Sequence, residues 1–551
     1  MAKQQIDGAV SNHLTMHLFA PGMSALHRAG LGGLACTLKA IERKYEEGRI
    51  AKSRLPAPFV DGVPPWDIEE QSIMLRFGKP EKAAAYLQRL FDLAFAIRKD
   101  GLIELPGQHH SDPTTPLLAD LQAGLTLTFL QHGKVRNLAK ESTAVSYNPE
   151  GDGVPGIIVE YRKCSSYKHQ EGWREFLNSK EQFATGSIKI DGPISPGSVV
   201  RHVAFTSSTA AADPPERMLP LYFALVGCLA LPVNRGVAVL LVPEVEDLLA
   251  FAFDRPWMTP ITARQVQVTN AADAALQAQV RMRAKNKMRG TAIPGCYAMT
   301  FTPTPWASQQ KSRVATVHIP AAEDRQLDRF ERALVLLPPR VVTRVVEETT
   351  GRGKQKIVVE RSRSFRADSV IRPLIAENLA LRRKWYAGFT CLMTKTNPAT
   401  NKPYRKKLSF ERKGLHDMIS DSTMWDQEGE SLVVQAVHEA IHHSLGRIRQ
   451  DTDGQTAKHL SQATKNRWKR FREKLRLDLA GAKTPAQLRF ALSSLFSRGG
   501  HNTILQKAWE KVLPVIRSDW QLARDLGLLA LASYAGDGAD SDLKEQSTTE
   551  S

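Results

Sequence analysis

The spacing of apolar side chains changes along the chain, and the first half mixes the periods typical of strands and of helices. Short apolar runs bounded by turn residues predict strands. Longer segments with apolar residues three and four apart predict helices. The predicted strands cover 13–19, 125–129, 156–161, 236–242, 297–302 and 313–319, and the predicted helices cover 24–47, 80–101, 218–231 and 271–288.

Three glycines, Gly30, Gly32 and Gly33, fall inside the predicted helix 24–47. A dinucleotide-binding turn would need a G-x-G-x-x-G register directly after a strand, and neither condition is met. Close packing of this helix against another is therefore the favoured interpretation.

The stretch from 340 to 407 predicts a hairpin, a helix and a loop in that order. Two β-branched runs, RVVTRVVE and KQKIVVER, flank TTGRGK, whose glycines supply the turn. A basic helix is expected over 369–386. The segment TKTNPATNKPYRKK follows, and its Asn-Pro and Lys-Pro steps indicate a loop.

From about Asp421 the pattern becomes helical throughout. Five amphipathic segments with short links predict a helical bundle over 421–535, and the acidic, polar segment 536–551 is predicted to be disordered. The predicted fold class is α+β. A large mixed α/β N-terminal region (1–420) precedes the C-terminal helical bundle.

The 551 residues carry a formal net charge of +18, and this excess is concentrated in two segments. Residues 340–420 contain 19 Lys and Arg against seven Asp and Glu, a net charge of +12. Residues 465–476 contain seven Lys and Arg against one Glu, a net charge of +6. The other residues together carry no net charge. Because such concentrations are typical of surfaces that follow a phosphate backbone, the charge predicts nucleic-acid binding.

The candidate residues combine cationic side chains, which position a phosphate backbone, with amides that can read base edges. They gather at a helix end, at the hairpin tip, in the loop and in the second basic segment. The predicted nucleic-acid-binding residues are Arg283, Lys285, Asn286, Lys287, Arg289, Arg352, Lys354, Lys395, Asn397, Asn401, Lys402, Arg405, Lys406, Lys407, Lys465, Lys469, Arg470 and Arg472.

A cytoplasmic protein without membrane contact is expected. The beginning of the sequence lacks a basic region followed by an apolar core. The longest apolar stretch, 219–231, has 13 residues, which suits a buried helix better than a spanning one. Five widely separated cysteines indicate neither a disulfide framework nor a zinc knuckle.

His438-Glu439-Ala-Ile-His442 matches the H-E-x-x-H pattern, in which two histidines bind zinc and the glutamate acts as a base. The extended form of this pattern would need Gly at 445 and His at 448, where Leu445 and Ile448 stand. Both histidines border an apolar stripe, so packing inside the bundle is favoured. We therefore expect no metal, no cofactor and no enzymatic activity. A zinc-dependent hydrolase and a free-standing nucleic-acid-binding protein remain the alternatives.

Several ordered blocks together resemble one family. They are MHLFAPGMSALHRAGLGGLA near the start, PWASQQKSRV, SFERKGLHDMI, and then VHEAIHHSLGRI, AKTPAQLRFALSSLFSRGG and DWQLARDLGLLALASY. The family is that of the Cas8 large subunits, of the fruiting-body-developmental kind, found in type I CRISPR effector complexes (Cascade). The resemblance extends over most of the chain.

The resemblance implies a non-catalytic subunit that acts with crRNA and with the other Cascade subunits: the backbone, the handle-binding and the helical small subunit. Its N-terminal region would recognise the protospacer-adjacent motif (PAM) in duplex DNA, and its bundle would guide the displaced strand and stabilise the R-loop. The first basic segment would hold duplex or handle RNA, and the second a single strand.

The downstream partner is left open by the resemblance. A helicase-nuclease would serve antiviral defence, and Tn7-like transposition proteins would serve a CRISPR-associated transposon. The bundle also resembles the separate small subunit of such complexes. Internal translation from Met418 or Met424 is therefore a further hypothesis.

Overall fold

The computed structural model describes residues 11–59, 63–148, 156–191, 194–196, 210–233, 236–289, 293–302, 313–350, 357–396, 403–454 and 459–535. The chain divides into two compact units. The first contains the residues up to Ala322 together with Arg361–Phe365, and the second contains Glu323–Glu360 and the residues from Arg366 onward. The expected boundary at 420 falls inside the second unit.

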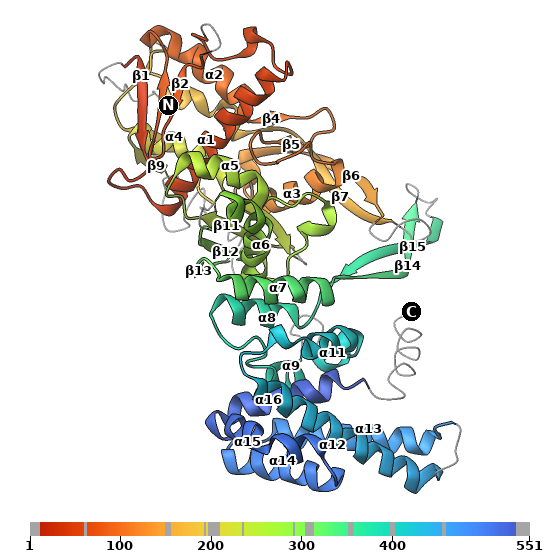
Figure 1. Ribbon diagram of the computed structural model, residues 1–551. Helices are drawn as coiled ribbons and strands as arrows, with labels where there is room; N and C mark the ends of the chain where they lie inside the picture. The colour runs from red at the N-terminus through yellow and green to blue at the C-terminus, as the bar shows by residue number, and fades with distance from the viewer. Residues whose placement is uncertain are drawn as a thin grey trace. The chain divides into compact units, whose positions relative to one another are not determined.

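Most strands belong to the first unit and form several small sheets (Figure 1). One antiparallel sheet has the order β1-β3-β2 and another the order β10-β11-β12-β13. The antiparallel pairs β4–β5 and β8–β9 are separate. The antiparallel pair β6–β7 continues into a larger sheet, because Ser364 pairs in parallel with Ile157 of β7. The strands are β1 (His13–His17), β2 (Trp66–Ile68), β3 (Ser72–Arg76), β4 (Ala96–Ile97), β5 (Ile103–Glu104), β6 (Arg136–Tyr147), β7 (Ile157–Tyr167), β8 (Ile188–Asp191), β9 (Ala210–Asp213), β10 (Leu229–Val233), β11 (Val237–Pro243), β12 (Cys296–Thr302) and β13 (Arg313–Ile319).

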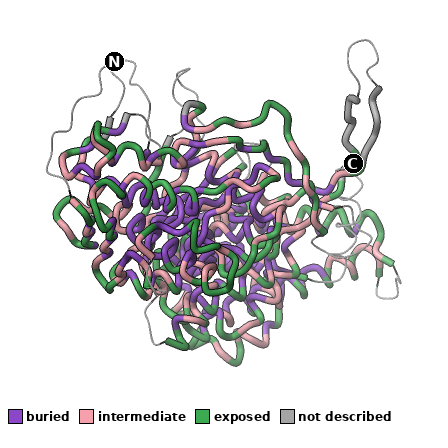
Figure 2. Tube along the Cα trace, turned by 90° about the horizontal axis from the view of Figure 1, so that it is seen from above, coloured by how far each residue is buried: buried purple, intermediate pink, exposed green. Residues whose placement is uncertain are grey.

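The helices of the first unit pack among these sheets. They are α1 (Ala25–Glu46), α2 (Ala83–Ala94), α3 (Thr115–Leu127), α4 (Pro215–Gly227), α5 (Leu248–Met258) and α6 (Ala271–Arg289). Ser24 begins α1, because its side chain accepts a hydrogen bond from the His27 backbone N–H. In Figure 2 buried and exposed positions alternate along the chain, as amphipathic elements require.

The glycines of α1 allow an unusually close approach to α4. A Cβ atom at Gly30 would lie 2.0 Å from the Pro220 carbonyl oxygen, and one at Gly33 would lie 2.2 Å from that of Phe223. On α4, a Cβ atom at Gly227 would lie 1.8 Å from the Ala29 carbonyl oxygen. The predicted packing role of the α1 glycines is confirmed, because no side chain fits between the two backbones.

The second unit begins with α7 (Asp324–Leu336). The strands β14 (Arg340–Thr350) and β15 (Ile357–Ala367) are neighbours in one sheet, as the hairpin pattern predicts. The remaining helices are α8 (Arg372–Ala380), α9 (Thr390–Thr394), α10 (Tyr404–Leu408), α11 (Arg412–Ser420), α12 (Glu428–Asp453), α13 (Gln462–Ala480), α14 (Pro485–Gly499), α15 (Thr503–Ser518) and α16 (Trp520–Ser533). Helices α12–α16 are the five that the sequence predicts (Figure 1).

Two predictions from short apolar runs are wrong. The run 125–129 is not a strand, because Leu125 continues the buried face that Leu118 and Leu121 form on α3. The predicted helix 218–231 ends at Gly227, and the following residues form β10 against β11. A continuous apolar run carries no period, so only tertiary pairing separates helix from strand there.

Two predicted helices are shorter than expected. After Pro80 a single 3₁₀ turn leads into α2, which ends at Ala94 because the following residues pair as β4–β5 around Gly101. The basic helix expected over 369–386 is reduced to α8. The chain leaves helical geometry at Arg382, whose φ is +55°.

The fold class is α+β, as predicted: strands concentrate in the N-terminal region and helices dominate the C-terminal region. Among the described residues, no helix combines the length and apolar composition needed to cross a membrane.

Candidate nucleic-acid interface

In the first unit, the predicted residues lie on the last turns of α6, beside α5. The Arg289 guanidinium pairs with Asp254 (Nη1 to Oδ1, 3.2 Å) and lies over the Phe253 ring, 4.3 Å from its centroid. The Lys285 ammonium lies 4.5 Å from the centroid of Trp257. Lys287 is exposed and Arg283 is half-buried. The helix end therefore presents cations over aromatic rings.

Asn286 does not share this exposure, which corrects the expectation that it reads base edges. Its side chain is 1% exposed and donates a hydrogen bond to Asp254 (Nδ2 to Oδ2, 3.2 Å). Burial raises the pKa of Asp254, and the contacts with Arg289 and Asn286 oppose that shift. Asn286 thus helps to hold α6 on α5, and we do not retain it as a base-reading candidate.

In the second unit, α13 carries the second basic segment on a helix with one buried face. Trp468, Leu475 and Leu479 are buried, and the Trp468 indole N–H donates to the Leu445 carbonyl of α12 (3.0 Å). Five cations outside this buried face are exposed. One of them, Arg467, donates a hydrogen bond to the Thr452 hydroxyl (3.1 Å). None of the other four forms an ion pair with a described residue. These four, which we call the α13 cations, are Lys465, Lys469, Arg470 and Lys474.

The other cations of this helix have structural partners. Arg472 lies over the Tyr534 ring at the end of α16, 5.9 Å from its centroid. Arg476 pairs with Glu473 (Nη2 to Oε1, 2.7 Å) and donates to the Met393 carbonyl (3.1 Å). These contacts hold α13 in place, and among the described residues they involve none of the α13 cations.

The structure joins two segments that the sequence treats separately. Arg405 of α10 forms an ion pair with Glu473 of α13, and the same carboxylate holds Arg476. Hydrogen bonding from Arg476 and both nearby guanidinium charges keep the pKa of Glu473 below its usual value, although burial opposes this. Lys406 and Lys395 are exposed nearby in sequence, and Lys407 is half-buried. The loop and the second basic segment therefore meet at one carboxylate.

Part of the charge between 340 and 420 is used inside the protein. Arg372 is 1% exposed. Lys384 pairs with Asp426 and Glu430 (2.6 and 2.7 Å), and these bonds raise its pKa although burial acts to lower it. The net charge of +12 thus overstates the phosphate-binding surface. Five predicted residues lie outside the described part of the chain: Arg352, Lys354, Asn397, Asn401 and Lys402.

The H-E-x-x-H motif lies on α12, where its side chains bind neighbouring helices. His438 Nε2 is 2.8 Å from the Ala530 carbonyl oxygen, and His442 Nδ1 is 3.1 Å from the Tyr534 hydroxyl. Burial lowers the pKa of His438 to about 4. Within the described residues, no three His, Cys, Asp or Glu side chains gather as metal ligands would. These contacts favour the packing interpretation for His438, whereas His442 is exposed and contacts the rim of the bundle at Tyr534.

Glu439 of the same motif caps a helix. Its carboxylate accepts hydrogen bonds from the Thr503 backbone N–H (2.9 Å), the Thr503 hydroxyl (2.7 Å) and the Ile504 N–H (3.2 Å). Burial acts to raise the pKa of Glu439, but these bonds lower it overall. The Glu439 carboxylate thus gives hydrogen-bond acceptors to backbone N–H groups at the start of α15, which have no partner within the helix.

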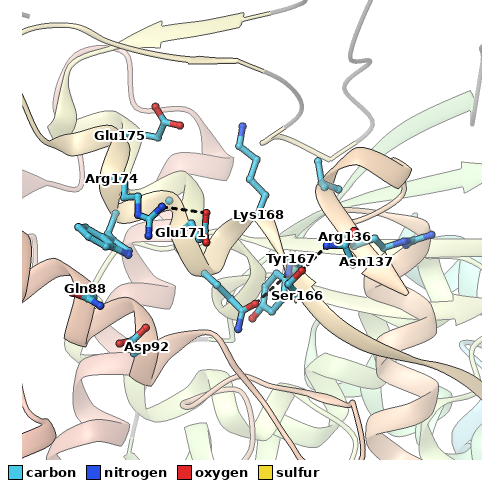
Figure 3. A pocket seen from close by; sticks show the side chains of 14 residues that line it. Gln88, Asp92, Arg136, Asn137, Ser166, Tyr167, Lys168, Glu171, Arg174 and Glu175 are labelled. Carbon is cyan, nitrogen blue, oxygen red and sulfur yellow. Dashed lines mark hydrogen bonds and ion pairs between the residues drawn. The ribbon is translucent and has the colours of Figure 1, made fainter. Parts of the chain in front are cut away.

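The first unit also contains an open, polar pocket of about 680 Å³ that the sequence does not reveal (Figure 3). It lies between α2, the start of β6, the end of β7 and the 3₁₀ segment Lys168–Phe176. Three cations line it, Arg136, Lys168 and Arg174, together with three carboxylates, Asp92, Glu171 and Glu175. The charges balance and Arg174 pairs with Glu171 (3.6 Å), so the pocket lacks the excess of positive charge typical of a phosphate-binding surface.

Two sets of residues at these surfaces were missed from the sequence. Lys474 lies in the second basic segment, but its exposure became evident only once the buried face of α13 was known. Phe253 and Trp257 are spaced four apart on α5, and their apolar character alone does not separate surface from core. The basic end of α6 is the signal that could have indicated these rings, because Lys285 and Arg289 pack over Trp257 and Phe253.

The fold and these cationic surfaces define a class: an α+β protein with a helical C-terminal part and exposed basic helices. Family models describe its two ends. The DevT N-terminal domain matches residues 15–222, and the DevT C-terminal domain matches residues 421–551. A CRISPR-associated protein Cas8a1/Csx13 from Myxococcus xanthus (strain DK1622) is 36% identical over 547 residues, covering 96% of this chain and 89% of the relative. The chain belongs to this Cas8 family of the fruiting-body kind.

Proposed function

We propose that the chain is the non-catalytic large subunit of a type I CRISPR RNA-guided DNA-targeting complex. This subunit binds crRNA, duplex target DNA and the displaced DNA strand. The family relationship and the relative's name support a role beside other Cas subunits. The structural observation that carries the proposal is the α13 cations, which project from a rigid helix with no acidic partner among the described residues.

We assign the two surfaces different parts of this work. The end of α6 acts on the PAM side of the target, where Lys285, Lys287 and Arg289 position a phosphate backbone. The α13 cations hold the displaced strand and thereby stabilise the R-loop, while guide pairing supplies most of the sequence specificity. A helicase-nuclease or Tn7-like transposition proteins would then act on the complex.

Purification with its partners tests the assignment. The full chain is coexpressed with the other subunits and a CRISPR array, and nucleic acid is extracted from the purified complex. We expect a guide RNA of uniform length that is lost when the array is omitted. If the chain purifies alone, with RNA of mixed length, it is a free-standing nucleic-acid-binding protein and the proposal is wrong.

A variant of the same complex tests the displaced-strand role. Replacing all four α13 cations by alanine should leave guide content unchanged and shorten the R-loop lifetime on target DNA. An unchanged lifetime would remove α13 from the proposal while leaving the subunit assignment in place.

A further inference from the structure

Helix α5 exposes a row of apolar side chains that the fold does not use. Leu249 is 41% exposed and Phe253 is 49% exposed, and the half-buried Trp257 continues the row one turn later. Their spacing of four residues places all three on one face of the helix. The opposite face, with Phe251 and Met258, is buried. Contiguous exposed apolar groups on a protein surface commonly mark an interaction site.

Cations cover this row from the neighbouring helix. Arg289 lies over Phe253, and Lys285 lies over Trp257, at 4.3 and 4.5 Å from the ring centroids. Because half of Phe253 stays exposed, part of its surface remains accessible beside the guanidinium. The geometry joins aromatic surface to positive charge along two helices, and we call it the α5–α6 ridge, made of Phe253, Trp257, Lys285, Lys287 and Arg289.

A further ring and a further cation extend the ridge at its Trp257 end. The exposed His110 ring lies 3.6 Å from the Trp257 ring, centroid to centroid. Burial, then the charges of Arg43 and Lys285, lower the pKa of His110, which reflects the closeness of both cations. Arg43 of α1, which also pairs with Glu47 (Nε to Oε1, 4.0 Å), therefore lies close to this end of the ridge.

The ridge is held rigidly. Arg255 of α5 is fully buried and donates to the Gly227 carbonyl (2.8 Å) and the Cys228 carbonyl (2.6 Å) at the end of α4. It also donates to the Thr259 hydroxyl (2.7 Å). These contacts satisfy carbonyls that a helix end leaves without partners. The exposed side of α5 is therefore set in place before any ligand arrives.

The combination indicates the class of ligand. Unpaired bases stack on aromatic side chains while their phosphates meet Lys and Arg, whereas the bases of a duplex are already stacked on one another. Asp254, which follows Phe253 in the chain, is 4% exposed and paired with Arg289, so its charge is largely neutralised. Resting on the proposed function, we propose that the α5–α6 ridge binds unpaired nucleotides of a single strand by stacking at Phe253.

Strands with and without bases test the stacking. The full chain, with the four α13 cations replaced by alanine, is titrated with an oligothymidylate and with a strand of stable abasic sites of equal length. We expect the strand with bases to bind roughly tenfold more tightly or better. Phe253→Ala should abolish this preference and leave the affinity for the abasic strand unchanged. Phe253→Leu, which keeps apolar bulk without a ring, should behave in the same way.

Controls separate stacking from charge and from folding. Phe490→Ala removes a phenylalanine that is 77% exposed on α14 and should change neither affinity. Lys287→Ala with Arg289→Ala should weaken both strands together, because phosphate contacts do not depend on bases.

Three outcomes would overturn the proposal. If Phe253→Leu binds like the parent, the contact is apolar rather than stacking. If Phe253→Ala changes the affinity for neither strand but releases another subunit from the assembled complex, the ridge is a protein interface. If the variant with Lys287→Ala and Arg289→Ala binds both strands like the parent, the end of α6 does not bind nucleic acid. The Phe253 variants test stacking alone, so the two results distinguish a failure of stacking from a failure of the proposed α6 surface.

Discussion

At the scale of single residues, His169 stands in an environment that strongly favours its neutral form. Its ring is 3% exposed and packs among Phe95, Tyr167 and Tyr222. Within the part of the chain that the structure describes, neither ring nitrogen has a hydrogen-bond partner, and the same holds for both tyrosine hydroxyls. Burial lowers the pKa of His169 to about 3.

This environment predicts acid sensitivity. In the unfolded chain the imidazole binds a proton near pH 6.5, whereas the folded protein resists protonation until about pH 3. The unfolded state therefore holds more protons between these values, and stability that is full above pH 6.5 falls as the pH drops. His169 alone should cost about 2 kcal/mol of unfolding free energy between pH 7 and pH 5.

The variant His169→Phe should remove that loss. Urea unfolding of the full chain at pH 7 and pH 5 should show a smaller difference in the variant than in the parent. His501→Gln, at an exposed position, serves as the control and should keep the parent's pH dependence. Equal pH dependence in His169→Phe and the parent would mean that the folded protein can protonate His169.

At the scale of elements, the α1–α4 pair shows what fixes the first unit. The two backbones touch where Gly33 meets Phe223 and Gly227, so the helices approach more closely than side chains would allow. By contrast, a Cβ atom at Gly446 on α12 would meet nothing within 4 Å. The two positions are both helical glycines and differ only in their surroundings.

Alanine at these positions should therefore have opposite effects. Gly33→Ala forces two backbones apart and should destabilise the protein by about 2 kcal/mol or more. Gly446→Ala should stabilise it by up to about 1 kcal/mol, because alanine favours a helix and nothing obstructs it. Thermal unfolding of both variants measures this. A neutral Gly33→Ala would show that α4 can move away from α1 at little cost.

Element by element, the sequence predicted those segments whose period is unambiguous. Helices α1 and α12–α16 follow amphipathic patterns, and several have recognisable caps, such as Thr484 before α14 and Asn502 before α15. It failed at 125–129 and around 228, where continuous apolar residues suit either structure. There the pairing of β10 with β11 and the packing of Leu125 decide, and both are long-range contacts.

At the scale of the whole molecule, location rather than total charge should govern nucleic-acid binding. We expect the salt dependence of single-strand binding to lie largely in the α13 cations. Replacing all four by alanine should reduce the slope of log K against log salt by about 3, since each phosphate contact to a single strand contributes about 0.7. Fluorescence titrations of the full chain over a range of salt concentrations give this slope.

A control with the same loss of charge checks the location. Lys52, Lys99, Lys180 and Lys507 are exposed lysines scattered over both units, and replacing them by alanine also removes four charges. The slope of log K against log salt for this variant should differ from the parent's by no more than about 0.7, the contribution of one phosphate contact. If the slope of log K against log salt falls equally in the two variants, net charge alone governs binding and α13 has no special role.

The sequence by itself determined the fold class, the family and the segments that carry the positive charge, because periodicity, motif order and charge are local properties of the chain. Tertiary structure decided which of those charges face solvent. Arg372 is buried, Lys384 is neutralised by two carboxylates, and Glu473 joins α10 to α13; the neutral amide of Asn286 is buried as well. Each outcome depends on residues distant in sequence, since a charge is available to a ligand only when folding leaves it without a protein partner.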